Sequence, residues 1–183
     1  ASACAEAALM AVGQKRRKKI VVSAGLHPHS KETLHTYLKH LEVEIVEAPL
    51  VDGPTQWGDL IDARTAAVFV QQPNFLGVIE DLDDVRHQTE THGALSIASL
   101  YPVATGLLRS PGHAGMDIVV GDGQSLGVPL GLGGPSFGFF ATQQKYVRKI
   151  PGRLVGLSQD AEGRRAYTLT FQTREQHIRR DKA

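Results

Sequence analysis

The most unusual stretch of the sequence is GDGQSLGVPLGLGGPSFGFFAT, from Gly121 to Thr142, with seven glycines and two prolines between two predicted strands. Glycine allows positive φ and close backbone approach, so amides in this loop could hold a phosphate or admit the backbone of a partner. A tight structural turn explains the same composition equally well. The glycines do not follow a GxGxxG order between a strand and a helix, so a dinucleotide-binding loop is not predicted.

The densest cluster of polar side chains lies near the end of the sequence, in the segment QTREQHIRR. Its candidate binding residues are Arg174, His177, Arg179 and Arg180. Arginine suits bidentate contacts with a carboxylate or phosphate, and the cluster could equally meet a partner protein. The competing interpretation is a solvated helix face on which Glu175 pairs with Arg179 at i,i+4.

Other titratable residues offer weaker candidates. His27 and His29 are close together, but no third ligand is nearby, so no metal site is predicted. Lys145 is the lysine nearest the glycine-rich loop, yet it falls in a predicted helix, where an exposed lysine is ordinary. Asp117 and Asp122 bracket a strand end, where ligand sites of α/β proteins gather, and either could instead cap a helix or turn.

The elements that must position these residues alternate between apolar runs and helical patterns. Strands are predicted over Lys19 to Ser23, Val43 to Val46, Ala66 to Gln71, Ala94 to Ser99, Asp117 to Val120 and Phe137 to Thr142. Helices are predicted over the N-terminal segment, Ser30 to Leu41, Trp57 to Arg64, Asp81 to Thr91 and Gln143 to Arg148. This alternation implies an α/β fold with a mostly parallel sheet and helices on both faces.

The two ends of the sequence are expected to be truncations, because both are helix-like and the first residue is Ala1. In the first helix Ala5, Ala8, Leu9 and Val12 form the predicted buried face, and Ser2 is the predicted N-cap. The second helix has the predicted inner face Leu34, Tyr37, Leu38 and Leu41. We interpret residues 1–183 as a single, partial domain, with a hairpin-like excursion over residues 151–172 that turns at Glu162 and Gly163.

Composition narrows the class of protein. Twenty basic and nineteen acidic side chains give a net charge of +1, which favours neither nucleic acid nor an anionic membrane as a partner. The single cysteine, Cys4, cannot form an internal disulfide and is expected to be a small buried residue. No apolar stretch approaches the roughly 20 residues of a membrane helix. A soluble protein of a reducing compartment is predicted, cytoplasmic or, in a eukaryote, in the mitochondrial matrix.

Seven motifs stand in the same order as in the glycine cleavage system P-protein, and the sequence resembles that family over essentially its whole length. They are Leu26-His27-Pro28, Gln71-Gln72-Pro73-Asn74, Gly121-Asp122-Gly123-Gln124, Gly133-Gly134-Pro135, Pro151-Gly152-Arg153, Asp160-Ala161-Glu162-Gly163-Arg164-Arg165 and QTREQHIRR. The last motif is long enough that chance explains it poorly, whereas the glycine-rich loop alone would be a weak match.

The resemblance implies the large domain of a fold type I pyridoxal-phosphate enzyme, in a protein of two homologous halves that are fused or separate subunits. In this family one half carries the cofactor lysine, in a His-Lys-Thr segment ahead of a glycine-rich loop. The corresponding segment here is Gly123-Gln124-Ser125, and Gln124 cannot form an aldimine. The usual aspartate partner of the pyridine nitrogen is also missing, because Ala98 to Tyr101 occupy its place.

The chain therefore resembles the N-terminal, lysine-lacking half, or subunit 1. The resemblance implies a share in glycine decarboxylation, with pyridoxal phosphate held by the partner half, or subunit 2, and an aminomethyl group passed to the lipoyl arm of the carrier H-protein. No catalytic residue is expected in this chain, and the isolated chain should be inactive. The active-site or interface candidates are Gln124, Gly133, Gly134, Pro135, Arg174, His177, Arg179 and Arg180. The alternatives are a phosphate- or nucleotide-binding module that uses the loop from Gly121 to Gly138, or a non-catalytic scaffold.

Overall fold

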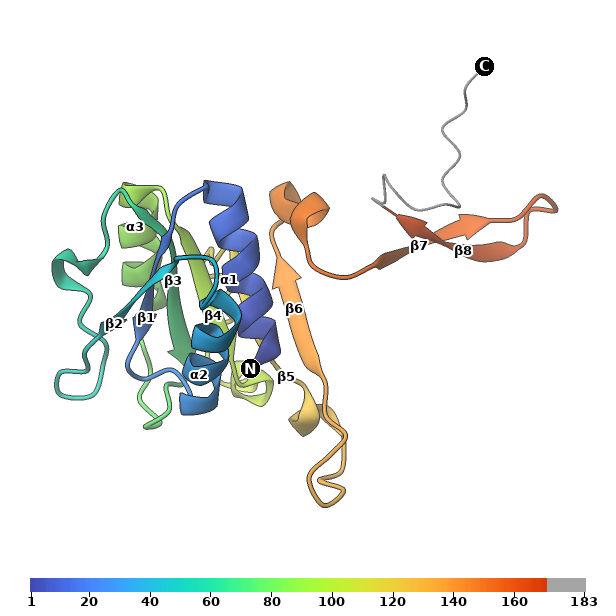
Figure 1. Ribbon diagram of the computed structural model, residues 1–183. Helices are drawn as coiled ribbons and strands as arrows, with labels where there is room; N and C mark the ends of the chain where they lie inside the picture. Colours follow the sequence, from blue (N-terminus) through green and yellow to red (C-terminus); the bar gives the residue numbers. More distant parts are fainter. Residues whose placement is uncertain (171–183) are drawn as a thin grey trace.

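A computed structural model describes residues 1–170, which contain a six-stranded sheet in the order β2-β1-β3-β4-β5-β6 (Figure 1). The strands are β1 Lys19–Ser23, β2 Glu44–Ala48, β3 Thr65–Gln72, β4 Leu95–Leu100, β5 Ile118–Asp122 and β6 Gly138–Thr142. The first five are parallel, as predicted. Strand β6 is antiparallel to β5 because the glycine-rich loop joins them without a crossover helix.

Helices cover both faces of the sheet. They are α1 Ser2–Lys15, α2 Pro28–Leu38 and α3 Leu82–His92, with short 3-10 turns η1 Gly58–Leu60, η2 Pro102–Gly106, η3 Gln124–Leu126 and η4 Gln144–Lys149. Alternate strand residues point to opposite faces, so Ile20 packs under α1 and α2 whereas Val21 belongs to the cluster that includes Leu82 and Val85 of α3. The predicted α/β class, with helices on both faces of a mostly parallel sheet, is confirmed.

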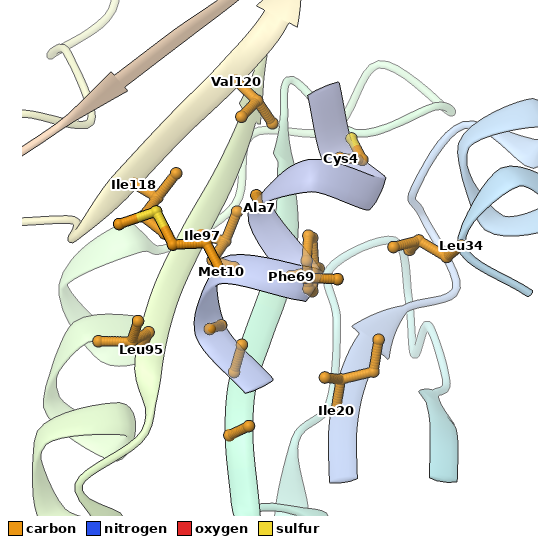
Figure 2. Close-up of a cluster of buried hydrophobic side chains, with 14 of the residues drawn as sticks. Cys4, Ala7, Met10, Ile20, Leu34, Phe69, Leu95, Ile97, Ile118 and Val120 are labelled. Carbon is orange, nitrogen blue, oxygen red and sulfur yellow. The ribbon is translucent and has the colours of Figure 1, made fainter. Parts of the chain in front are cut away.

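Small side chains let α1 lie close to the sheet. Ala7, Ala8 and Ala11 are completely buried, and Figure 2 shows the α1 side chains against those of β3, β4 and β5. Cys4 is also buried, as expected. The prediction of Ser2 as the N-cap is wrong, because the helix already includes Ser2 and the N-cap is Ala1, without a side-chain hydrogen bond.

Two predicted helices are 3-10 turns instead. The region of Trp57 to Arg64 holds only the turn η1, and the helix predicted over Gln143 to Arg148 is the 3-10 turn η4, Gln144–Lys149. Helix α2 ends at Leu38, so Leu41 no longer follows the helical period, and both Tyr37 and Leu41 are exposed although Leu34 and Leu38 are buried. No helix within residues 1–170 is long and apolar enough to cross a membrane.

Buried ion pairs lie at the amino ends of the strands. The Asp117 side chain is 2% exposed, and its Oδ2 lies 2.8 Å from the Arg86 guanidinium. Lys145 Nζ lies 3.2 Å from the other oxygen, Oδ1. Nearby, Lys19 donates to Asp62 at 2.9 Å and thereby holds the pKa of that carboxyl well below its usual range. Asp117 and Lys145 therefore have structural roles at this edge.

A two-stranded antiparallel hairpin follows the sheet. It consists of β7 Leu154–Gln159 and β8 Arg165–Thr170, and Figure 1 shows it projecting away from the sheet. Val155, Leu157 and Tyr167 are exposed, so the hairpin has little apolar packing of its own. The division into one domain with an excursion over residues 151–172 stays a prediction.

Gly121 is required where β5 passes β4 and β6. A Cβ atom at this position would collide with the carbonyl oxygen of Leu100 and with the ring of Phe139. We expect Gly121→Ala to lower the free energy of unfolding by about 1–3 kcal/mol, because the core cannot accommodate the added methyl group. Gly13→Ala is the matched control, since nothing lies within 4 Å of its Cβ position. In α1 that change should raise stability by about 0.5–1 kcal/mol. Urea denaturation of both variants checks the difference, and equal effects would contradict it.

His27 caps α2 and should make its stability depend on pH. Nδ1 of His27 accepts a hydrogen bond from the His29 amide at 3.1 Å, which requires an unprotonated nitrogen. Burial, reinforced by the nearby charge of His29, lowers the pKa of His27. Since the folded pKa lies below the unfolded value, this contribution is complete above about pH 6.5 and is lost as the pH falls through the folded pKa.

We therefore expect acidification from pH 8 to pH 5 to lower the Tm of the wild type by about 2–4 °C more than that of His27→Asn. Asparagine is a good N-cap that does not titrate, so it serves as the matched control. Thermal denaturation across this pH range measures the difference, and parallel pH profiles would refute the role of His27.

Candidate functional site

A pocket of about 380 Å³ opens at the edge where β1, β3, β4 and β5 have their carboxyl ends. Its lining comes from the starts of α1 and α2 and from the strand ends, and includes Cys4, His27, His29, Ser30, Gln71, Ser99, Tyr101 and Asp122. Strand β2 lies on one side of β1, and β3, the next strand along the chain, lies on the other side of β1. The direction in which strands are added therefore reverses at β1, and this topological switch point lies beside the pocket. Ligands of open α/β sheets bind at such a point.

The wall of the pocket nearest β1 is held by contacts of His27. Its backbone amide donates to Oε1 of Gln71 at 2.9 Å, which joins the segment after β1 to the end of β3. The His27 ring has centroid distances of 5.0 Å to both His29 and Phe75, and it meets Phe75 edge to face. Within residues 1–170, no group of three or more His, Cys, Asp or Glu side chains is arranged to hold a metal ion.

The thiol in the pocket is not set up as a nucleophile. Burial raises the pKa of the Cys4 thiol, and hydrogen bonding from Ser30 and Ser99 opposes this only in part. A thiol with a raised pKa carries little thiolate at neutral pH, and the thiolate is the reactive form. Cys4 therefore contributes packing at the base of the pocket.

The pocket has no side-chain amine that could form a Schiff base. Among residues 1–170, none of those that line it is a lysine. Gln124 does not line it either. Its backbone amide donates to Asp122 Oδ1 at 2.8 Å, and its side-chain Nε2 donates to the Val128 carbonyl at 2.6 Å. Lys145 pairs with Asp117 at the opposite edge of the sheet. In the described part of the chain, Gln124 shapes the glycine-rich loop.

Gly133, Gly134 and Pro135 lie near the tip of that loop, away from the pocket. The loop extends beyond the edge of the sheet (Figure 1), and Gly133 and Gly134 both have positive φ. Ser136 Oγ ties the returning strand to Asp122, with 2.8 Å to Oδ1. The other four predicted site residues, Arg174, His177, Arg179 and Arg180, lie outside the described residues.

Large apolar side chains are exposed on the loops that follow β3, β4 and β5, and we call this set the carboxyl-edge surface. It consists of Phe75, Leu76, Ile79, Tyr101, Val103, Leu107, Leu126, Leu130, Leu132 and Phe137. Leu107 and Leu132 are essentially fully exposed. Turns η2 and η3 contact each other, so the loops after β4 and β5 share one region. Exposed apolar groups of this extent mark interaction surfaces.

Gln71 and Ser99 are pocket residues that sequence reasoning left without a role. Each lies at the carboxyl end of a predicted parallel strand, where ligands of α/β sheets bind, so this position could have identified both as candidate site residues. His27 and His29, for which the sequence predicted no metal site, are exposed and also line the pocket.

Comparison with known proteins agrees with this geometry. The family model of the glycine cleavage system P-protein matches residues 1–183. A probable glycine dehydrogenase (decarboxylating) subunit 1 of Desulforamulus reducens is 54% identical over 186 residues, which cover 100% of this chain and 42% of that protein. A similar subunit 1 of Geotalea uraniireducens is 53% identical, also with 100% and 42% coverage. The chain thus spans about two fifths of the length of these relatives.

The fold agrees as well. The crystal structure of an inhibitor-bound glycine decarboxylase (P-protein) of the glycine cleavage system superimposes with a TM-score of 0.90 at 45% identity, over 98% of this chain and 41% of that one. A sphingosine-1-phosphate lyase of Burkholderia pseudomallei shares only the fold, with a TM-score of 0.61 at 15% identity over 91% of this chain and 41% of that one. The chain belongs to the glycine cleavage system P-protein family.

Proposed function

We propose that this chain is the non-catalytic part of a glycine dehydrogenase (decarboxylating), and that it completes the active site or interface of a cofactor-bearing half. The observation that carries the proposal is a pocket at the ligand-binding edge of the sheet that has no lysine in its lining. The relatives over 50% identical are described as subunit 1 of this enzyme, which supports a role in glycine decarboxylation.

The residues of this pocket do not fit pyridoxal phosphate as a covalent cofactor. When bound in an enzyme of this kind, the cofactor withdraws electrons from the substrate carbon through a Schiff base. Within residues 1–170 the lining offers no lysine, and its acidic residue, Asp122, already accepts hydrogen bonds from the Gln124 backbone amide and the Ser136 hydroxyl. We therefore assign the cofactor to the partner half.

The carboxyl-edge surface is the region we assign to that partner. Gln124 supports the loop from inside, whereas Gly133, Gly134 and Pro135 shape its tip beside the exposed Leu130 and Leu132. Arg174, His177, Arg179 and Arg180 remain proposed contacts with the partner half or with anionic groups. Glycine and the lipoyl-bearing H-protein are the further partners that this function requires, and a cytoplasmic location stays a prediction.

A phosphate- or nucleotide-binding role for the glycine-rich loop has less support. The amides of Gly133 and Gly134 both donate to the Leu130 carbonyl, at 2.9 and 3.0 Å, and the Val128 amide donates to the Gln124 carbonyl at 3.0 Å. Amides that are already bonded within the loop are not available to cradle a phosphate. The scaffold alternative differs from our proposal in predicting no effect of this chain on catalysis.

Addition of pyridoxal phosphate to this chain should produce no visible absorption band of an internal aldimine, because the pocket lacks a lysine. The lysine-bearing half is the positive control under the same conditions. Titration with ATP should likewise leave the intrinsic fluorescence unchanged. A visible band that borohydride abolishes, leaving a pyridoxyl group covalently attached to one specific lysine of this chain, would contradict the assignment of the cofactor to the partner.

Decarboxylation should require both halves. We would follow the exchange of labelled bicarbonate into glycine with the full-length subunit that contains this chain and the lysine-bearing half.

Leu132→Asp should weaken the association of that subunit with the lysine-bearing half at least about tenfold, because it places a charge in an apolar contact. Leu41→Asp, an exposed leucine at the amino edge, is the matched control and should have no effect. Full activity of the lysine-bearing half alone would refute the proposed function.

A further inference from the structure

Glu80 is a buried carboxylate at the carboxyl edge that none of the roles above uses. It is 5% exposed, and it precedes Asp81, the N-cap of α3. Its oxygens accept from the Thr55 amide at 3.0 Å, the Thr55 hydroxyl at 2.7 Å and Asn74 Nδ2 at 2.9 Å. Within residues 1–170 no salt bridge to Glu80 is present. Burying a charge that has only neutral hydrogen-bond donors around it lowers the stability of the fold, which indicates that Glu80 has a role other than stabilisation.

The Asn74 side chain extends this network through residues 73–79. Its Oδ1 accepts from the amides of Leu76 and Val78, both at 3.0 Å, while its Nδ2 donates to Glu80 and to the Gly53 carbonyl. The loop of residues 73–79 therefore folds around the Asn74 side chain, and Glu80 fixes the orientation of this side chain.

Glu80 is linked to the ends of two strands, to β1 through its carboxylate and Thr55 and to β3 through its backbone amide. Thr55 Oγ1 lies 2.6 Å from the hydroxyl of Ser23, the last residue of β1. The Glu80 amide donates to Oε1 of Gln72, the last residue of β3, at 2.8 Å. Glu80 thus ties the 73–79 loop to the rigid part of the sheet.

The loop places Phe75 against His27, which lines the pocket. The Phe75 amide donates to the Gly25 carbonyl at 2.7 Å, and its ring packs edge to face against His27. Gly25 has to be a glycine, because a Cβ atom there would lie 2.9 Å from Cβ of Asn74. Leu76 and Ile79 of this region belong to the carboxyl-edge surface.

We infer that Glu80 is a positioning residue: its buried carboxylate holds the 73–79 loop so that Phe75 and His27 keep a fixed place at the edge that this chain offers to the cofactor-bearing half. The inference rests on the proposed function for its catalytic consequence. The structural part, that Glu80 orders the loop, stands on its own hydrogen bonds.

The test compares Glu80→Gln with Asp117→Asn in the full-length subunit, assembled with the lysine-bearing half. Glutamine keeps the shape but turns an NH₂ group toward a donor, either Thr55 or Asn74, so one pair of donors must face each other. Asp117→Asn neutralises an equally buried carboxylate at the opposite edge. Both variants should lose stability, and both are assayed well below their Tm.

For Glu80→Gln we expect hydrogen exchange of the Leu76 and Val78 amides to accelerate at least about tenfold, and kcat to fall about tenfold with KM changed less. Asp117→Asn should change neither the exchange in residues 73–79 nor kcat. If Glu80→Gln does not fold, Thr55→Val removes one donor to Glu80 and should act in the same direction, with Thr55→Ser restoring the wild-type behaviour.

Unchanged exchange in residues 73–79 would overturn the positioning role. An equal fall of kcat in Asp117→Asn would overturn it too, since the effect would then be general destabilisation. Failure of the proposed function is a separate result: the lysine-bearing half would be active alone, while the exchange measurement would still report whether Glu80 orders the loop.

Discussion

The fold depends on one geometric requirement. Between two parallel strands, the connecting segment must cross a face of the sheet to bring the chain back to the edge where each strand begins. Strands β1 to β5 therefore all end at one edge, and the loops that leave them meet there. The strands have to be apolar on both sides, because α1 and α2 cover one face and α3 the other. The pocket, the glycine-rich loop and the carboxyl-edge surface all follow from this single geometric condition.

The two edges of the sheet use polar groups differently. At the amino edge, the buried carboxylate of Asp117 faces the cations of Arg86 and Lys145, so charge is balanced locally. At the carboxyl edge, Glu80 is held by neutral donors only, in the described part of the chain. Paired charges stabilise a closed structure, whereas a network of neutral donors around a carboxylate fixes the shape of loops that are themselves exposed.

The glycine-rich loop is shaped by close backbone approach and by its own hydrogen bonds. Gly121 and Gly123 are needed because the chain passes Leu100 and Phe137 too closely for a side chain. The side-chain amide of Gln124 donates to the Val128 carbonyl and so closes the turn at the start of the loop. The loop is organised around its own hydrogen bonds and carries the exposed Leu130 and Leu132 at its tip, which suits contact with another protein.

The α/β class, most strand positions and the family could be predicted from the sequence, because apolar periodicity and short ordered motifs are local properties. The residue type alone also excluded a Schiff base at Gln124. The position of Asp117 at the edge opposite the pocket and the contact between His27 and Gln71 could not be predicted, because they depend on segments far apart in the chain. The network around Glu80 joins residues 23, 55, 74 and 80 for the same reason, since burial and hydrogen-bond partners arise only when the sheet brings these segments together.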